Sequence, residues 1–342
     1  MENYLRLPAE WERQSAVLIA WPHAETDWAY ILNEVIECYK NIAKAILSDE
    51  KLIIATPEPL STCNDLAGIN ITNAELYTIP TNDTWARDFG PISVLRNKKP
   101  VLFDFTFNAW GMKFAADLDN VITSTLEWQG AFNCPVENHM DFVLEGGSIE
   151  SDGNGCIMTT EECMTSINRN GHLSFDEIDA YLKLTFGAKK ILWLHNGALE
   201  GDDTDGHIDT LARFAPDNTI IYVGCDDSGD SHYEGLKAME AELKNATNAD
   251  GEPFRLIKLP FPDAIYDEQC NRLPATYANF LITNNQVLVP TYSQPENDAL
   301  ALKLIAEAFP GRKTTGIDCR ALIKQHGSLH CVTMQLIENV IE

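Results

Sequence analysis

The sequence predicts an α/β fold in which five repeating β-β-α-β units form a closed ring, a five-bladed pseudo-symmetric α/β propeller. Two observations lead to this class. The same order of strands and helices recurs along the chain, although the repeats share little sequence identity. The first unit has only one strand before its helix, and the final segment LHCVTMQL (329–336) could supply the missing strand. An α/β sandwich with mixed sheets is the alternative.

Each expected strand is a short run rich in β-branched and aromatic residues, and each expected helix is a longer segment with helical apolar spacing. The first unit comprises the strand 15–22, the helix 28–47 and the strand 51–56. The other expected elements are strands at 92–96 and 101–107 with a helix near 113–128; a strand at 156–164, a helix near 174–186 and a strand at 189–195; strands at 207–214 and 219–224, a helix near 231–245 and a strand at 254–260; and strands at 278–283 and 286–292, a helix near 297–308 and a strand near 314–318.

The charge of the chain excludes several classes of protein. Among 342 residues, 51 are acidic and 25 are basic, so the formal net charge is −26. Such an excess of carboxylates argues against binding to nucleic acid or to anionic membranes. No linker or low-complexity tract divides the sequence, which predicts one catalytic domain spanning residues 1–342. The acidity itself indicates either general solubility or a cationic ligand, and composition alone favours solubility.

Cysteine usage and the N-terminus predict a reduced, cytoplasmic protein. The N-terminus lacks the pattern of a signal peptide, and no apolar run reaches the length of about 18 residues needed to span a membrane. The nine cysteines are odd in number and form no CxxC pair. EF-hand, Walker, dinucleotide-binding and HExxH patterns are also absent. We therefore expect no metal and no organic cofactor, and a homodimer is left open.

Four segments combine residue types suited to chemistry on a cationic group: TNDTWARDFGPI (81–92), LEGGSIESDGNG (144–155), LEGDDTDGHIDTLARF (199–214) and HGSLHCVTMQ (326–335). In the third segment, His207 and Asp209 lie two residues apart in an expected strand. They would therefore point to the same side, as proton transfer beside a bound cation requires. A surface His–Asp pair is the structural alternative.

The other motifs add a nucleophile and a site for a planar cation. Cys331 follows a Gly-Ser turn signal and begins an expected strand, on its polar face, where a nucleophile could be presented. The remaining cysteines are interpreted as small buried hydrophobic residues. Trp85 and Asp88 form an aromatic and carboxylate pair of the kind that holds a guanidinium group. A structural Asp88 beside Arg87 is the alternative.

At these four segments together, the sequence resembles the agmatine deiminases and the related bacterial peptidyl-arginine deiminases of the guanidino-group-modifying superfamily. The similarity extends over nearly the full chain and includes AVLIAWPH (16–23), FNAWG (107–111), TTEEC, NRN, YANF (277–280) and the terminal His-Cys pair. The resemblance implies the five-bladed pentein propeller. Two departures bear on the substrate subclass: HGSLHC replaces a glycine-rich run before the cysteine, and Met112 follows FNAWG.

The resemblance implies roles for individual residues. Cys331 matches the family's nucleophile and His207 matches its general acid/base. Asp88 and Asp209 match two carboxylates that clamp the guanidinium. The residues implied at the substrate are Trp85 as an aromatic wall, Asp203 and Glu145 near the far amine or behind the catalytic groups, and Asn279 and Trp110 as weaker candidates.

The implied reaction is hydrolysis of agmatine to N-carbamoylputrescine and ammonia through a thiouronium intermediate on Cys331. The acidic residues within 200–205 favour a dication as the substrate. The alternatives are a deiminase of free or peptidyl arginine, a metal-dependent hydrolase that uses His207 and Asp209, and a non-catalytic acidic binding module.

Overall fold

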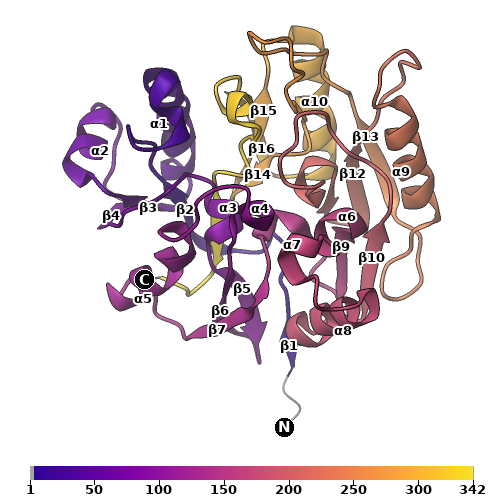
Figure 1. Cartoon of the computed structure of the whole chain (residues 1–342), viewed down its shortest axis with the longest axis horizontal. Coiled ribbons are helices and arrows are strands. Elements are labelled where there is room, and N and C mark those ends of the chain that lie inside the picture. Colours follow the sequence, from indigo (N-terminus) through magenta and orange to yellow (C-terminus); the bar gives the residue numbers. More distant parts are fainter. Residues whose placement is uncertain (1–3, 342) are drawn as a thin grey trace.

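The computed structural model describes residues 4–341 and contains five β-sheets (Figure 1). In spatial order, sheet one contains β17 (Met334–Ile337), β2 (Gln14–Ala20), β3 (Lys51–Thr56) and β4 (Ala74–Thr78), and sheet two contains β1 (Leu5–Arg6), β5 (Ile92–Arg96), β6 (Lys99–Thr106) and β7 (Val136–Val143). Sheet three contains β8 (Ile149–Ser151), β9 (Cys156–Thr160) and β10 (Lys190–Leu194), and sheet four contains β11 (Ala212–Ala215), β12 (Thr219–Val223) and β13 (Arg255–Leu259). Sheet five contains β14 (Leu281–Ile282), β15 (Gln286–Thr291) and β16 (Lys313–Asp318).

All five sheets share one plan. An antiparallel strand pair is followed by a parallel strand, and a helix links the two parallel strands. These linking helices are α1 (Leu32–Leu47), α5 (Ile122–Trp128), α8 (Phe175–Phe186), α9 (Tyr233–Asn245) and α10 (Pro295–Ala308). The predicted β-β-α-β units are thereby confirmed. Strands β1 and β4 extend two of the sheets.

The C-terminal strand completes the first unit, as predicted. β17 pairs antiparallel with β2, with Met334 opposite Leu18 and Gln335 opposite Val17. Strands near the two ends of the sequence, β2 and β17, therefore lie in one sheet. This pairing places the segment before β17, which carries Cys331, beside the N-terminal third of the chain.

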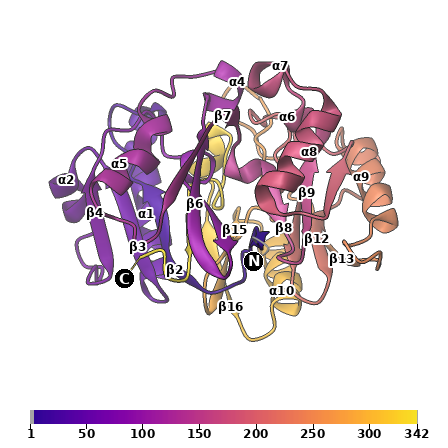
Figure 2. The same cartoon turned by 90° about the horizontal axis from the view of Figure 1, so that it is seen from below.

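The linking helices lie at the periphery of the molecule, outside the strands (Figures 1 and 2). In α1, the buried residues Val35, Tyr39, Ile42 and Ile46 recur at helical spacing, so one face packs inward. The ends of α8 are set locally, because Ser174 and Glu177 form a capping box before its first turn. No helix within residues 4–341 is long and apolar enough to cross a membrane.

Several predicted boundaries are wrong. The expected strand 156–164 ends at Thr160, because α6 (Glu161–Met164) follows directly, and the preceding strand β8 was not predicted. The expected helix near 113–128 begins only at Ile122. The other short helices are η1 (Asp27–Ile31), α2 (Pro59–Asp65), α3 (Ala86–Phe89), α4 (Ala109–Met112), η2 (Asp119–Val121), η3 (Gly146–Ser148), α7 (Ile167–Asn170), η4 (Ile208–Thr210) and η5 (Leu322–Gln325).

Candidate active site

The predicted catalytic residues come together around Gly147. A side-chain carbon at Gly147 would lie 2.7 Å from Nδ1 of His207, 2.9 Å from Oδ1 of Asp88 and 3.1 Å from Oδ2 of Asp209. Only glycine leaves room for three polar groups at that point. The double glycine in the LEGGS motif is therefore required by the close approach of other side chains.

Asp88 is carried by the short helix α3 and is nearly fully buried. Its Oδ2 accepts a hydrogen bond from Trp110 Nε1 at 2.9 Å, and its Oδ1 accepts one from the Gly147 N–H at 3.0 Å. Burial raises the pKa of Asp88 well above its usual value, and the nearby charge of Asp209 adds to this effect. The uncharged form of Asp88 is therefore favoured more than in a solvent-exposed aspartate.

His207 is buried and lies immediately before the 3-10 helix η4, so its predicted position in a strand is wrong. Its Nδ1 is 3.7 Å from Oδ1 of Asp88, and its Nε2 has no hydrogen-bond partner within the described residues 4–341. Burial lowers the pKa of His207 to about 3, so the ring is neutral near pH 7. A neutral imidazole can take up a proton.

Asp209 lies inside η4, where a turn rather than strand alternation brings it toward His207. Its Oδ2 accepts a hydrogen bond from Nδ1 of His330 at 2.8 Å, whereas its buried Oδ1 has no partner among residues 4–341. Burial acts to raise the pKa of Asp209, but the His330 hydrogen bond and nearby basic groups, Arg213 among them, together outweigh burial, so the pKa is lowered. Asp209 is thus an ionised carboxylate with one free oxygen.

Cys331 lies in a turn three residues before β17, so the predicted strand 329–336 begins too early and its face argument fails. The thiol sulfur is 3.9 Å from Oδ2 of Asp209 and 3.4 Å from Oδ1 of Asn279. Burial, with the charges of Asp209 and Asp88, raises the pKa of the thiol well above its usual value. A cation bound between these two carboxylates would offset the part of the rise in the thiol pKa that their charges cause.

Asn279 holds the turn that presents the thiol. Its Oδ1 accepts hydrogen bonds from the backbone N–H of His330 at 2.8 Å and of Cys331 at 3.3 Å. Its Nδ2 donates to the carbonyl oxygen of Asp209 at 3.4 Å. Asn279 is fully buried and is not among the residues that line the cavity described below, in contrast to its predicted place at the substrate.

A cavity of about 150 Å³ opens beside Asp88 and Cys331. The aromatic side chains of Trp85, Trp110 and Phe114 line it, and the contact of the two tryptophans with a substrate stays a prediction. Gly327 also lines it, and a side-chain carbon there would lie 2.1 Å from the Trp85 ring.

Three further carboxylates line the same cavity: Asp27, Asp83 and Asp203. Asp203 was predicted at the substrate, and its half-exposed side chain lies 3.9 Å from Nε2 of His326. Sequence reasoning missed Asp27 and Asp83. Asp83 had a detectable signal, since it belongs to the same motif as Trp85, whereas Asp27 lies in a segment with no distinctive pattern.

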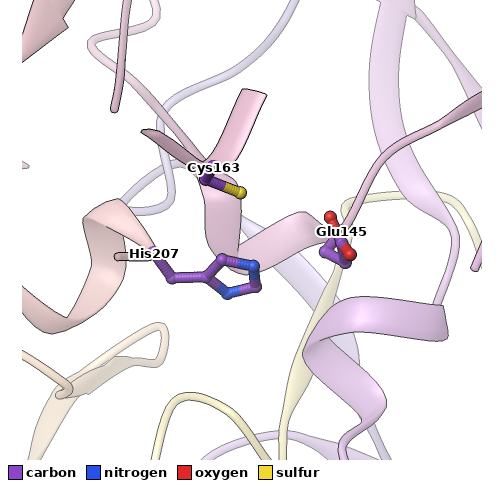
Figure 3. Close-up of side chains that lie close together, drawn as sticks. All are labelled: Glu145, Cys163 and His207. Atoms are coloured by element: carbon purple, nitrogen blue, oxygen red, sulfur yellow. The ribbon is translucent and has the colours of Figure 1, made fainter. Parts of the chain in front are cut away.

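Glu145 lies near His207 and Cys163, with potential metal ligand atoms within 4.8 Å of one another (Figure 3). Both Glu145 oxygens, however, accept hydrogen bonds from Nε of the buried Arg169, at 2.9 and 3.0 Å. The guanidinium group already neutralises this carboxylate and would repel a metal cation. Glu145 does not line the cavity, and its contact with the far amine or its support of the catalytic groups stays a prediction.

Nearly the whole chain is similar to known proteins. Residues 6–336 match the family model described as Porphyromonas-type peptidyl-arginine deiminase. The chain belongs to that family. A curated "Putative agmatine deiminase" of Legionella pneumophila is 35% identical, with 96% of this chain and 94% of the relative aligned. This membership confirms the resemblance inferred from the four segments and the prediction of an enzyme that hydrolyses C–N bonds.

Solved structures of the family also superpose closely on this deiminase. A "Putative Arginine Deiminase" from Porphyromonas gingivalis has a TM-score of 0.95 and 50% identity, covering 99% of this chain and all of that one. A cysteine-to-serine variant of the C. jejuni agmatine deiminase with substrate bound has a TM-score of 0.92 and 40% identity, covering 98% of this chain and 97% of that one.

Proposed function

We propose that this deiminase hydrolyses agmatine to N-carbamoylputrescine and ammonia. The observation that carries the proposal is the convergence of Asp88, His207 and Asp209 on Gly147, with the sulfur of Cys331 3.9 Å from Asp209. Two carboxylates can accept the N–H groups of a guanidinium, and the rings of Trp85 and Trp110 can cover its faces. The residues require neither a metal nor an organic cofactor for the steps below.

In the first half-reaction, His207 takes the thiol proton and the Cys331 thiolate attacks the guanidinium carbon. The protonated His207 then gives its proton to one amino group, the C–N bond breaks, and ammonia leaves. A thiouronium intermediate remains on Cys331. In the second half-reaction, water attacks the same carbon while His207 accepts a proton. The C–S bond then breaks and His207 returns its proton to the thiolate. The second water proton passes to solvent, where the released ammonia takes it up as ammonium, and the neutral ureido product leaves.

The charges around the cavity favour agmatine over arginine. Agmatine carries a distal ammonium and no carboxylate, and Asp27, Asp83 and Asp203 can attract that ammonium. An arginine substrate needs a cationic partner for its carboxylate. Arg87, Arg169 and Arg213 are already used in buried ion pairs: Arg87 with Glu10 at 3.0 Å, Arg169 with Glu145 at 2.9 Å and Arg213 with Glu150 at 2.8 Å.

The deciding experiment measures ammonia and ureido product with agmatine, free arginine and an arginine-containing peptide. We expect turnover of agmatine above the other two. The Cys331→Ala variant should lose more than about a thousand-fold in kcat, as removal of a catalytic nucleophile commonly does. The exposed Cys63→Ala is the matched control and should keep full activity.

Free or peptidyl arginine is the second candidate, favoured by the description of the family model. Higher turnover of the peptide than of agmatine would establish it and overturn the agmatine proposal. If the protein were a metal-dependent hydrolase, the Cys331→Ala variant would keep its activity, and a chelator would abolish the activity.

We further propose that the five sheets are the blades of one propeller domain with the site on its axis. Each link between successive sheets supplies one part of the site. Asp88 follows sheet one, Gly147 follows sheet two, His207 and Asp209 follow sheet three, Asn279 follows sheet four, and Cys331 follows sheet five. Links from five sheets can meet at one point if the sheets surround it. A single domain predicts one cooperative unfolding transition by both calorimetry and circular dichroism.

A further inference from the structure

His330, next to the proposed nucleophile, joins the site to a buried cluster on its far side. The ring is almost fully buried, and its Nδ1 donates to Oδ2 of Asp209 at 2.8 Å. Its other nitrogen, Nε2, lies 2.9 and 3.0 Å from the two carboxylate oxygens of Glu10. One imidazole therefore contacts two carboxylates with its two opposite edges.

Glu10 is itself firmly held. It lies in the segment between β1 and β2, and Arg87 Nη1 donates to its Oε1 at 3.0 Å. Arg213 forms an ion pair with its other oxygen. Two buried guanidinium groups thus fix Glu10. Arg213 Nη2 also lies 3.1 Å from Nε2 of His330, so Glu10 and Arg213 together limit rotation of the His330 ring.

The arrangement has a consequence for Asp209. The terminal torsion of an aspartate is soft, so its carboxylate plane is set mainly by its hydrogen bonds. Among residues 4–341, His330 and the Cys331 thiol contact Oδ2, whereas the buried Oδ1 accepts no hydrogen bond. A buried oxygen that has lost water and gained no hydrogen bond is costly unless a ligand supplies one. The free oxygen is therefore oriented for a donor that arrives with the substrate.

We propose that His330 is a positioning residue, anchored by Glu10, that fixes the plane of the Asp209 carboxylate and so determines how tightly the guanidinium is held. The inference rests on the proposed function of this site. It predicts that the hydrogen bond from the Nδ1 position matters for substrate binding and that the bulk of the ring does not.

Two substitutions separate these effects. In His330→Asn, the side-chain amide can donate from the place of Nδ1 and keep the bond to Asp209. In His330→Gln, the amide reaches the place of Nε2 and leaves Asp209 unheld. Both remove the ring from the same buried space and should lower the melting temperature similarly. A purely structural role of His330 would therefore affect both variants alike.

Agmatine binding is measured by calorimetry with both substitutions made in the Cys331→Ala background, and kcat and KM are measured in the native background. We expect His330→Gln to weaken binding by roughly ten-fold or more, the usual effect of losing a hydrogen bond to a charged group, and His330→Asn by less than about three-fold. Equal weakening by both variants, or none by either, would overturn the inference.

Two more variants complete the test. Glu10→Gln should weaken agmatine binding by an intermediate amount, whereas Glu12→Gln, on the same segment but paired with Arg6, should leave it unchanged. If unmodified enzyme releases no ammonia from any guanidine, the proposed function itself fails and the inference falls with it. If ammonia is released but the Asn and Gln variants do not differ, only the inference fails.

Discussion

Asp88 and Asp209 are both fully buried, yet their surroundings shift their pKa values in opposite directions. Burial and the charge of Asp209 raise the pKa of Asp88, whereas the His330 hydrogen bond and nearby basic groups together lower the pKa of Asp209 against the effect of burial. A bound guanidinium favours the ionised form of both carboxyl groups, so substrate binding should lower the pKa of Asp88.

Asp83 gives a pH-dependent test of the substrate proposal. Burial, with a contribution from Asp27, raises the pKa of Asp83 to about 7. As pH rises through 7 the side chain becomes an anion and can attract the distal ammonium of agmatine. We therefore expect KM for agmatine to fall by roughly ten-fold between pH 6 and pH 8, equivalent to about 1.4 kcal/mol.

Asp83→Asn should remove most of this pH dependence, and the exposed Asp250→Asn should retain it. Initial rates over this pH range with each variant make the comparison. An unchanged pH dependence in Asp83→Asn would show that another group is responsible.

The candidate catalytic residues predicted from the sequence lie close together, but the sequence did not predict the elements that carry them. His207 and Asp209 were assigned to a strand and lie at a 3-10 turn, and Cys331 was assigned to a strand that starts three residues later. Elements of three or four residues are too short for a period of 2 or 3.6 to be visible. Residue types and motif spacing still identified the side chains, because the chemistry fixes them whatever the local backbone is.

The close packing of Gly327 on Trp85 makes a prediction at the scale of this turn. A methyl group at Gly327 would lie 2.1 Å from the indole ring, so Gly327→Ala must shift the ring or the turn before Cys331. Misplacing reacting groups by about 1 Å can cost roughly a hundred-fold in rate, and we expect a loss of that order in kcat/KM.

The matched control is Gly235→Ala in helix α9, where no atom lies within 4 Å of the added carbon. It should keep full activity and raise the free energy of unfolding by about 0.5–1 kcal/mol, since alanine favours a helix interior. Full activity of Gly327→Ala would argue against a rigid cavity wall at Trp85.

At the scale of the whole molecule, the repeated order of elements and the role of the last strand were predictable, because both depend on local patterns along the chain. The buried cluster of Glu10, Arg87 and Arg213 was not. Its members are separated by up to 203 residues, and a single sequence carries no signal for such a contact. The contacts of His330 were likewise not predicted from the sequence, although this residue lies next to Cys331.

The joint between sheets one and five contains a buried carboxylate whose charge is unfavourable. Glu50 accepts a hydrogen bond from Asn284 at 2.6 Å, and burial, with the charge of Asp49, raises its pKa to about 8. A folded pKa above the unfolded value means that stability is highest below about pH 4.5 and declines as pH rises through 8. Glu50→Gln should therefore be more stable than the parent at pH 9 by at least about 1 kcal/mol.

Urea unfolding at pH 5 and pH 9 measures this difference, with the exposed Glu25→Gln as the control. At pH 5, where Glu50 is protonated in the folded protein, the variant and the parent should be close in stability. A larger advantage at pH 5 than at pH 9 would contradict the assignment.

With a net charge of −26, either the charge of the whole surface or a few cavity carboxylates could select the dication. The Debye length shortens from about 30 Å at 0.01 M salt to about 8 Å at 0.15 M, so salt weakens long-range attraction while it affects contacts inside the cavity much less. We expect kcat/KM for agmatine to fall a few-fold over this range. Asp83→Asn should lower kcat/KM by a similar factor at both salt concentrations, because its effect is local. If its effect disappeared at high salt, attraction by the whole surface would account for substrate selection, and the cavity carboxylates would not.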